Sequence, residues 1–540
     1  MTPPMALYSR RNQQLDATTH DGKGKINAMD KIDAEPVPAQ QSTQTRPCDT
    51  AHTLSKEQLA VGASTMASDS KSPKSPTKTT ANSSHKPKSR IRKGSFRSRT
   101  SPLDYETLER EQNSMRGFFT LFWVFMAIYV VVTAYKNYRA EGIFISLRFY
   151  QQFSHDAIGL IVVDAAMILS LFVPFLAQAW LGGLGWSRGV WTIAMHVWQG
   201  VWFGVCLAIA FGKEWPWIQS GAFVGHCITM LFKQHSYSSY NIDLRFKHKQ
   251  LLHLRQLLTE HKKDDDHDST YPRTRSKTIE DASLTGTDAM IAEIADLEKE
   301  LIKPNVSFPN NITLWNYIDY LLVPTLVYEL SYPRTEKFRP LYFINKAAAT
   351  LCTFGLLYVS YEHYILPVLL DMPNHTFFDS VFQLMMPFTM CYLLIFFIIF
   401  ECICNAFAEL TCFADREFYE DWWNSSTYDE FARKWNKPVH EFLLRHVYLE
   451  SISTYKLSKT NATLMTFFLS SCVHELVMFV IGKKLRLYLF GLQMFQVPMI
   501  FIARIGWIKK QKLAGNVFFW FGMIFGPPLL AVTYMREHYA

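Results

Sequence analysis

The feature that most constrains this chain is a series of long apolar blocks separated by polar stretches. A helix needs about 20 mostly apolar residues to cross a bilayer. Inside lipid each backbone polar group needs a partner within the protein, so such blocks form helices rather than strands. We therefore predict an all-α polytopic membrane protein with about nine transmembrane helices; two short blocks leave the number at eight or nine. The blocks are 118–135, 157–181, 189–212, 216–232, 341–361, 378–400, 460–482, 487–503 and 513–535.

The composition excludes soluble, coiled-coil, collagen-like and fully disordered classes. Apolar residues make up 49% of the 540 residues and charged residues 19%, against about 25% charged in an ordinary soluble protein. The net charge of +8 lies largely in the first hundred residues and in loops. This fits the flanks of a membrane protein better than a nucleic-acid-binding surface. The nine cysteines are scattered and form no pair of CxxC units, so we expect no metal site.

The N-terminal stretch 1–100 lacks an apolar block and is rich in Ser, Thr, Pro, Gln and Lys. Such a composition buries too little apolar surface to fold, so we predict a disordered tail at 1–100 and a membrane domain at 101–540. Seven Lys or Arg residues within Lys86–Arg99 place this basic tail in the cytosol. A second interpretation is that this stretch binds anionic lipid headgroups. We expect deletion of the tail to leave the chemistry intact.

The predicted topology follows from the nine spans and the cytosolic tail. It places 233–340 and 401–459 in the cytosol and the C-terminus on the other side. Within the first of these loops, 246–262 and 289–303 have the periodicity of amphipathic helices, and the charged, Ser/Thr-rich 263–288 is predicted to be a flexible linker. Three cations fall on the predicted lumenal side and argue against this topology: Lys483, Lys484 and Arg486.

Ionisable residues inside the apolar blocks are the strongest functional signal. His474 lies about 21 Å along the block 460–482, and such deep ionisable groups usually face a cavity or a partner. A neutral imidazole at this depth is able to accept a proton, as a general base acting on an alcohol must. The alternative is that His474 only hydrogen-bonds a neighbouring helix. Depth alone does not distinguish it from His196 and His226, and Asp164 is a further intramembrane ionisable residue.

A second unusual stretch is 418–424, Phe-Tyr-Glu-Asp-Trp-Trp-Asn, in a predicted cytosolic loop. Aromatic side chains mixed with an acid and an amide are typical of the membrane interface, so one interpretation is an aromatic anchor. Cations and hydrogen-bonding side chains follow, and they suit a phosphorylated ligand near the bilayer surface. They are Arg433, Lys434, Trp435, Asn436, His440, Arg445, His446, Tyr448, Lys456 and Lys459.

Four motifs in order resemble the sterol and diacylglycerol acyltransferase branch of the membrane-bound O-acyltransferases. The stretch 418–424 is similar to the FYxDWWN signature of this branch, and Arg433–Asn436 resembles its RxWN segment. His474-Glu475-Leu476 resembles the segment with the catalytic histidine, and Tyr332–Thr335 matches a further motif. The resemblance covers about 100–535. The signature positions are Phe418, Tyr419, Asp421, Trp422, Trp423 and Asn424.

The resemblance also implies a subfamily and a set of site residues. The stretches 309–313, 439–446 and 464–468 look most like fungal sterol O-acyltransferases. The resemblance implies that His474 is the general base and that Asn436 is the second catalytic residue. Glu430 stands where the family has an asparagine contact, which puts that position in doubt. The positions where the family contacts acyl-CoA are Arg433, His440, Tyr448, Lys459 and Ser470.

The function implied by the resemblance is esterification of a sterol 3β-hydroxyl with a long-chain acyl group to make sterol esters for storage. Acyl-CoA is then a substrate, no cofactor is needed, and the partners are a membrane sterol and the bilayer. The family also implies the endoplasmic reticulum membrane and a homo-oligomer, a dimer or tetramer. One alternative is a diacylglycerol O-acyltransferase that makes triacylglycerol. A non-enzyme alternative is a membrane lipid transporter, which inverted repeats would favour; we find none in the sequence.

Overall fold

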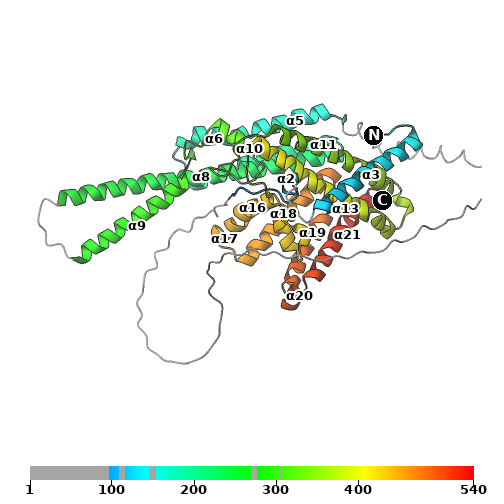
Figure 1. The fold of residues 1–540 in the computed structure, drawn as a ribbon. Coiled ribbons are helices and arrows are strands. Elements are labelled where there is room, and N and C mark those ends of the chain that lie inside the picture. The colour runs from blue at the N-terminus through cyan, green and yellow to red at the C-terminus, as the bar shows by residue number, and fades with distance from the viewer. Residues whose placement is uncertain (1–95, 109–115, 145–153, 269–276, 305, 540) are drawn as a thin grey trace, which may run out of the picture. The chain divides into compact units, whose positions relative to one another are not determined.

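The computed structural model describes residues 96–108, 116–144, 154–268, 277–304 and 306–539. These residues confirm the all-α class, because they form helices joined by turns and one two-stranded hairpin (Figure 1). The predicted tail lies outside the described residues up to position 95. The elements are α2 (Tyr105–Leu108), α3 (Arg116–Glu141), α5 (Ala157–Ser170), α6 (Phe172–Trp180), η1 (Leu181–Gly183), α7 (Arg188–Gly212), α8 (Trp217–Asp268), α9 (Lys277–Leu301), β1 (Ile302–Lys303), β2 (Val306–Ser307), α10 (Leu314–Leu322), α11 (Pro340–Ser360), η2 (Tyr361–Ile365), α12 (Leu366–Leu370), η3 (Met372–Asn374), α13 (Phe377–Phe396), η4 (Phe397–Ile403), α14 (Cys404–Leu410), η5 (Trp422–Asn424), α15 (Tyr428–Lys434), α16 (Lys437–Leu443), η6 (Leu444–Leu449), α17 (Glu450–Ser453), α18 (Lys459–Gly482), α19 (Tyr488–Ala503), α20 (Gly506–Lys510) and α21 (Lys512–Tyr539).

Seven helical segments among the described residues are long and apolar enough to cross a bilayer, where nine were predicted. The block 487–503 forms α19, whose 16 residues extend about 24 Å and are shorter than a full crossing. The block 216–232 is the start of α8, which continues as one helix of 52 residues into a polar half. The seven segments are Arg116–Glu141, Ala157–Gly183, Arg188–Gly212, Pro340–Leu370, Phe377–Leu410, Lys459–Gly482 and Lys512–Glu537.

Three helices widen locally into π turns, namely η2, η4 and η6. The turn η2 joins α11 to α12, and η4 joins α13 to α14, so each pair forms one continuous span. The turn η6 directly follows α16. Because π turns are frequent at functional sites, η4 before the signature and η6 after Asn436 mark the region where a site is expected.

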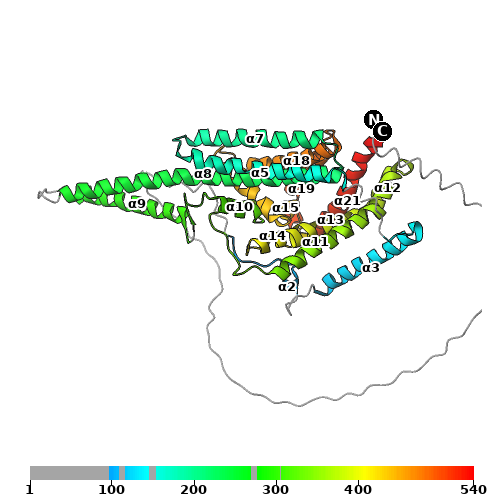
Figure 2. The same cartoon turned by 90° about the horizontal axis from the view of Figure 1, so that it is seen from above.

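The amphipathic helices predicted at 246–262 and 289–303 are confirmed as parts of α8 and α9, except that α9 ends at Leu301 and 302–303 form β1. The two helices run side by side (Figures 1 and 2). The linker predicted at 263–288 is wrong in extent. α8 extends into this stretch as far as Asp268, and α9 begins at Lys277. Residues 269–276 between them are not among the described residues. The physical reason is that a charged, Ser/Thr-rich composition also suits a helix with a narrow apolar stripe.

Two of the three cations that argued against the predicted topology, Lys483 and Arg486, have partners at one end of the helices. Lys483 donates from Nζ to the carbonyl oxygens of Ala210 and Phe211 at 2.9 and 2.8 Å. These carbonyls belong to the last turn of α7, where a cation is favourable. Arg486 forms an ion pair with Glu537 of α21. Lys483 and Arg486 therefore have a structural role at this end of the bundle.

Aromatic side chains form the largest core cluster, which surrounds the chain between α13 and α15. Phe396 and Phe400 of the continuous α13–η4 helix contact Tyr419 and Trp422 in this cluster. Part of the aromatic content of 15% therefore serves to build this core, because large rings contribute both apolar area and edge-to-face contacts. α18, which carries His474, packs against α8, α19 and η6.

Candidate active site

His474 lies on α18 with its ring exposed rather than packed in the core. Its Nδ1 atom is 2.8 Å from the carbonyl oxygen of Ser470, one helical turn earlier. A carbonyl oxygen only accepts hydrogen bonds, so Nδ1 carries the proton, and in the neutral ring Nε2 then has the free lone pair. This is the tautomer that a general base needs.

Glu475, the next residue, holds α18 against two other helices. Its side chain is 2% exposed. Its carboxylate accepts hydrogen bonds from the backbone N–H groups of Leu487 at 2.8 Å and Phe490 at 3.0 Å, where the helix dipole of α19 favours a negative charge. The hydroxyl of Tyr534 on α21 donates a third bond at 3.2 Å. These bonds occupy the carboxylate, so Glu475 fixes the position of α18 against α19 and α21.

We expect Glu475→Ala to destabilise the protein, because two backbone N–H groups lose their acceptor. An unsatisfied buried donor costs about 1–3 kcal/mol. Thermal unfolding of the detergent-solubilised protein should show a lower midpoint, with a smaller decrease for Glu475→Gln, which keeps one acceptor oxygen. Glu336→Ala is the control, since Glu336 is exposed. An unchanged midpoint in Glu475→Ala would contradict the positioning role.

Asn436 caps the N-terminus of α16 with its side chain. Its Oδ1 atom accepts a hydrogen bond from the backbone N–H of Val439 at 3.1 Å. Pro438 in the first turn suits this start, because proline has no N–H to satisfy. The cap uses the oxygen of the amide and leaves its NH2 group as a fixed donor. Asn436 therefore combines a structural bond with a group that is able to stabilise a developing negative charge.

The signature segment holds the backbone on both sides of Asn436. The N–H of Glu420 donates to the carbonyl of Lys434 at 2.9 Å. The N–H of Lys437 donates to the carbonyl of Phe418 at 3.0 Å. Two backbone hydrogen bonds thus flank the Asn436 position, so the signature acts as its scaffold.

Packing of rings adds to this scaffold. Trp435, directly before Asn436, stacks on Tyr392 with ring centroids 4.7 Å apart and planes at 13°. It also meets Trp422 edge to face at 4.9 Å. Phe418, Tyr419 and Trp422 are at most 2% exposed. Because these rings are core residues, the interpretation of the signature as an aromatic membrane anchor is wrong for them.

The polar part of the signature ties it to α15 and α21. Asp421 pairs with Lys434 at 2.9 Å and accepts a bond from the amide of Asn424 at 3.3 Å. Burial raises the pKa of Asp421, but the bonds from Lys434 and Asn424 outweigh it, so the pKa lies below its ordinary value. The carbonyl of Trp423 accepts a bond from Asn516 of α21 at 2.9 Å.

The predicted acyl-CoA contacts lie on neighbouring elements, because η6 packs against α18 and α16 runs directly into η6. Two of the side chains, Arg433 and Lys459, are exposed cations. Arg433 also pairs with Asp429 at 2.8 Å. Burial raises the pKa of Asp429, but the hydrogen bonds from Arg433 and Thr427 outweigh it, so the pKa lies below its ordinary value. The five residues are Arg433 on α15, His440 on α16, Tyr448 on η6, and Lys459 and Ser470 on α18.

Glu430, which stands where the family has an asparagine, is occupied by internal contacts. Its carboxylate accepts hydrogen bonds from the backbone N–H and the hydroxyl of Ser426 at 3.0 and 3.1 Å. It also pairs with Lys434 at 2.9 Å. Burial raises the pKa of Glu430, but these bonds lower it below its ordinary value. The carboxylate thus serves the turn that starts α15.

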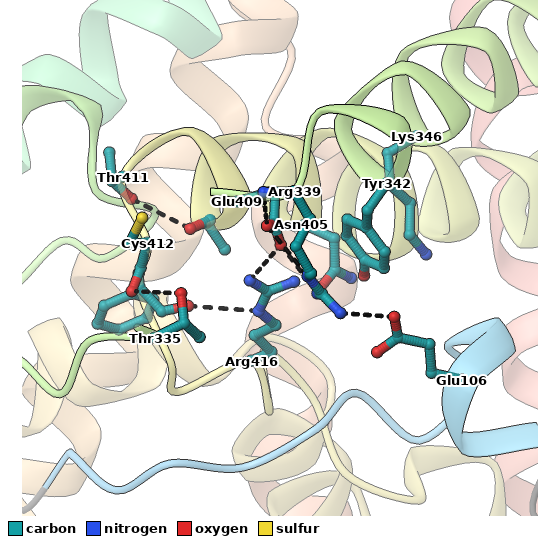
Figure 3. Close-up of polar contacts among 12 residues, drawn as sticks. Glu106, Thr335, Arg339, Tyr342, Lys346, Asn405, Glu409, Thr411, Cys412 and Arg416 are labelled. Carbon is teal, nitrogen blue, oxygen red and sulfur yellow. Dashed lines mark hydrogen bonds and ion pairs between the residues drawn. The ribbon is translucent and has the colours of Figure 1, made fainter. Parts of the chain in front are cut away.

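The Tyr-Pro-Arg-Thr motif pairs with the chain just before the signature. The N–H of Ala414 donates to the carbonyl of Pro333 at 3.0 Å, and the N–H of Thr335 to the carbonyl of Cys412 at 2.7 Å. Figure 3 shows Thr335 against Cys412. The structure therefore brings this motif and the signature together, although 77 positions separate Thr335 from Cys412.

Two buried glutamates are important residues that sequence reasoning missed. Glu409 is 0% exposed and lies between Arg339 at 2.9 Å and Arg416 at 2.6 Å (Figure 3). Glu401, also 0% exposed, accepts a hydrogen bond from the signature hydroxyl of Tyr419 at 2.5 Å. The two glutamates are about two helical turns apart and so share one face. Two glutamates with this spacing at the end of an apolar block are the sequence pattern that identifies them.

The other intramembrane ionisable residues have partners of their own. Nδ1 of His226 lies 2.7 Å from Oδ1 of Asp164. The ring of His196 lies 5.6 Å from that of His235. This pairing of His226 with Asp164 distinguishes it from His474, whose Nε2 atom faces no such carboxylate among the described residues.

Comparison with known proteins agrees with the motifs. Residues 148–536 match the model of the MBOAT, membrane-bound O-acyltransferase, family. The chain belongs to the membrane-bound O-acyltransferase family. It is therefore a membrane-embedded acyltransferase, and the ordered motifs around Asn436 and His474 lie within the matched region.

The relatives that align over most of this chain are named sterol O-acyltransferases, and a diacylglycerol O-acyltransferase aligns over less than half of it. A probable sterol O-acyltransferase 1 of Schizosaccharomyces pombe is 35% identical over 78% of this chain and 82% of its own length. The sterol O-acyltransferase 2 of Candida albicans is 33% identical over 83% of this chain and 79% of its own length. The diacylglycerol O-acyltransferase 1A of Glycine max is 33% identical over 43% of this chain and 48% of its own length.

Proposed function

We propose that this protein is an acyl-CoA-dependent sterol O-acyltransferase with His474 as its general base. The observation that carries the proposal is the 2.8 Å contact between Nδ1 of His474 and the carbonyl oxygen of Ser470, which assigns the proton of the neutral ring to Nδ1 and leaves Nε2 to accept a proton. Sterol as the alcohol is supported by the relatives named for that reaction, which align over about four fifths of the chain.

The proposed reaction needs one base and one hydrogen-bond donor. As the sterol oxygen attacks the thioester carbon, Nε2 of His474 takes its hydroxyl proton and the new C–O bond forms. The amide NH2 of Asn436 donates to the thioester oxygen as negative charge develops there. The C–S bond then breaks, and His474 returns the proton to the leaving thiolate of CoA. A thioester is already activated, so the proposal requires no covalent acyl-enzyme and no metal.

The charged CoA moiety is proposed to enter where the cations lie. Arg433 and Lys459 are exposed, and charge-assisted bonds to phosphate are stronger than neutral ones. His440, Tyr448 and Ser470 complete the proposed contacts. The sterol is proposed to enter sideways from the bilayer, since its fused rings are apolar and only its hydroxyl must reach His474.

The cellular setting is part of the same proposal. We place the protein in the endoplasmic reticulum membrane with its N-terminus and the acyl-CoA contacts in the cytosol, where CoA esters are charged and soluble. We also propose a homo-oligomer, a dimer or tetramer. Cross-linking in native membranes, read as ladder size, tests the assembly, and a single monomer band would contradict it.

A competition between alcohols tests the substrate. Purified protein given a sterol and a diacylglycerol with the same labelled oleoyl-CoA should esterify the sterol at least about tenfold faster. That ratio corresponds to about 1.4 kcal/mol in transition-state binding. Faster triacylglycerol formation would overturn the choice of sterol and leave acyl transfer by His474 intact. Absence of acyl transfer to either alcohol would overturn the proposed function.

A further inference from the structure

The chain just before the first span forms an extended strap along the segment that precedes the signature. The N–H of Arg99 donates to the carbonyl of Ala414 at 3.0 Å, and the N–H of Arg416 donates to the carbonyl of Arg99 at 2.9 Å. Residues 96–100 were predicted to belong to a disordered tail, yet Arg99 forms a parallel β-bridge with Asp415. Backbone pairing of this kind fixes where the Arg99 side chain points.

The guanidinium of Arg99 binds two carboxylates at once. Its Nε and Nη2 atoms donate to the two oxygens of Asp415 at 2.8 and 2.7 Å, and Nη1 donates to Glu417. Asp415 has a side chain that is only 4% exposed. The side-chain bonds to Asp415 raise the pKa of Arg99 above its ordinary value, against desolvation. A two-point contact of this kind is stronger and more directional than a single ion pair.

Glu417 connects Arg99 with Lys437, the residue next to the proposed catalytic asparagine Asn436. Its Oε2 atom accepts bonds from both Arg99 and Lys437. Lys437 directly follows Asn436, and its backbone N–H donates one of the two hydrogen bonds that flank the Asn436 position. The route from the strap to the proposed amide donor therefore contains one carboxylate and one lysine.

We propose that Arg99 is a positioning residue for Asn436, acting through Glu417 and Lys437. The proposal rests on the proposed function, because it assumes that the Asn436 amide stabilises the transition state. Without Arg99, the charge on Asp415 is left nearly buried and unpaired, and Glu417 loses one of its two cations. The Asn436 side chain is then held less accurately, while its amide is still able to donate a hydrogen bond.

Other contacts keep the strap in place when Arg99 is replaced. The ring of Phe96 packs edge to face on Tyr332 at 5.3 Å and on Phe413 at 5.9 Å. At the other end, Asp104 pairs with Lys346 at 2.7 Å. An Arg99→Ala variant should therefore fold with the strap still docked, and its defect should be seen in catalysis.

The test is steady-state kinetics of the full chain with oleoyl-CoA and a sterol, expressed per folded protein. Arg99→Ala is expected to lower kcat about tenfold with KM for oleoyl-CoA within twofold. Misplacement by about 1 Å costs about 100-fold, and the shift of Asn436 is expected to be smaller because Arg99 acts on it only through Glu417 and Lys437. Arg99→Lys should recover part of kcat, since a lysine is able to bind one carboxylate but not span two. Arg97→Ala is the matched control: Arg97 is exposed, and its contact to Asp415 uses the backbone N–H.

A double-mutant cycle tests the route. If Arg99 acts through Lys437, the combined kcat loss in Arg99→Ala with Lys437→Met should be smaller than the product of the single losses. Losses that multiply would overturn the route. A kcat of Arg99→Ala within twofold of the wild type, or a change in KM alone, would overturn the positioning role. If Arg99→Ala does not fold, Arg99→Lys decides by the same kcat criterion. Failure of the proposed function is distinct, because the wild type would then make no ester.

Discussion

Replacement of His474 by alanine should abolish most ester formation while the protein still folds and reaches the membrane. General base catalysis contributes about 10²–10⁴-fold, and the variant should lose a factor in this range in kcat. The ring is exposed on α18, and its Nδ1 bond goes to a carbonyl of its own helix. Its removal therefore breaks no hydrogen bond to another helix in the described part of the chain, and the fold should be retained.

The measurement is turnover of labelled oleoyl-CoA with a sterol, per folded protein. His226→Asn is the matched control, because it replaces another histidine and its amide is still able to donate to Asp164. The control should keep turnover within a few-fold of the wild type. Near-normal turnover in His474→Ala would remove His474 from the mechanism, and His440 would be the next candidate base.

The second large effect is expected at Asn436, where two roles are separable by choice of substitution. Asn436→Asp keeps an oxygen that caps α16, since aspartate and asparagine are similar N-caps. It removes the NH2 donor and places a negative charge where the thioester oxygen gains one. Loss of one such donor costs about 10²–10³-fold in kcat. We expect this loss with an unfolding midpoint close to that of the wild type.

Asn436→Ala should lose both roles. The kcat should fall by a similar factor, and the unfolding midpoint should also fall, because loss of a side-chain cap costs about 1 kcal/mol. Asn436→Ser is the neutral control for charge, as serine caps well and lacks the amide donor. Normal turnover in Asn436→Asp or Asn436→Ser would show that Asn436 is only a cap.

Several features of this protein are readable from the chain alone. The apolar blocks predict the spans, because bilayer thickness sets the length of a crossing helix. The depth of His474 follows from a rise of 1.5 Å per residue. The signature and the segments around Asn436 and His474 predict the family, which the match over 148–536 confirms. All of these properties are local in sequence, so they need no knowledge of which helices are neighbours.

Other features depend on the tertiary structure. The sequence predicts a span at 216–232, but that stretch belongs to the long helix α8, because apolar periodicity does not mark where a helix ends. The sequence also does not show that the carboxylate of Glu475 accepts hydrogen bonds from the backbone at the start of α19.

The strap illustrates the same limit over a longer range. Arg99 belongs to a stretch whose composition predicts disorder, yet it lies against Asp415, a residue 316 positions away. Composition measures how much apolar surface a segment is able to bury by itself. It does not register a segment that is ordered by carboxylates on another part of the chain, and those carboxylates come together only after the helices have packed.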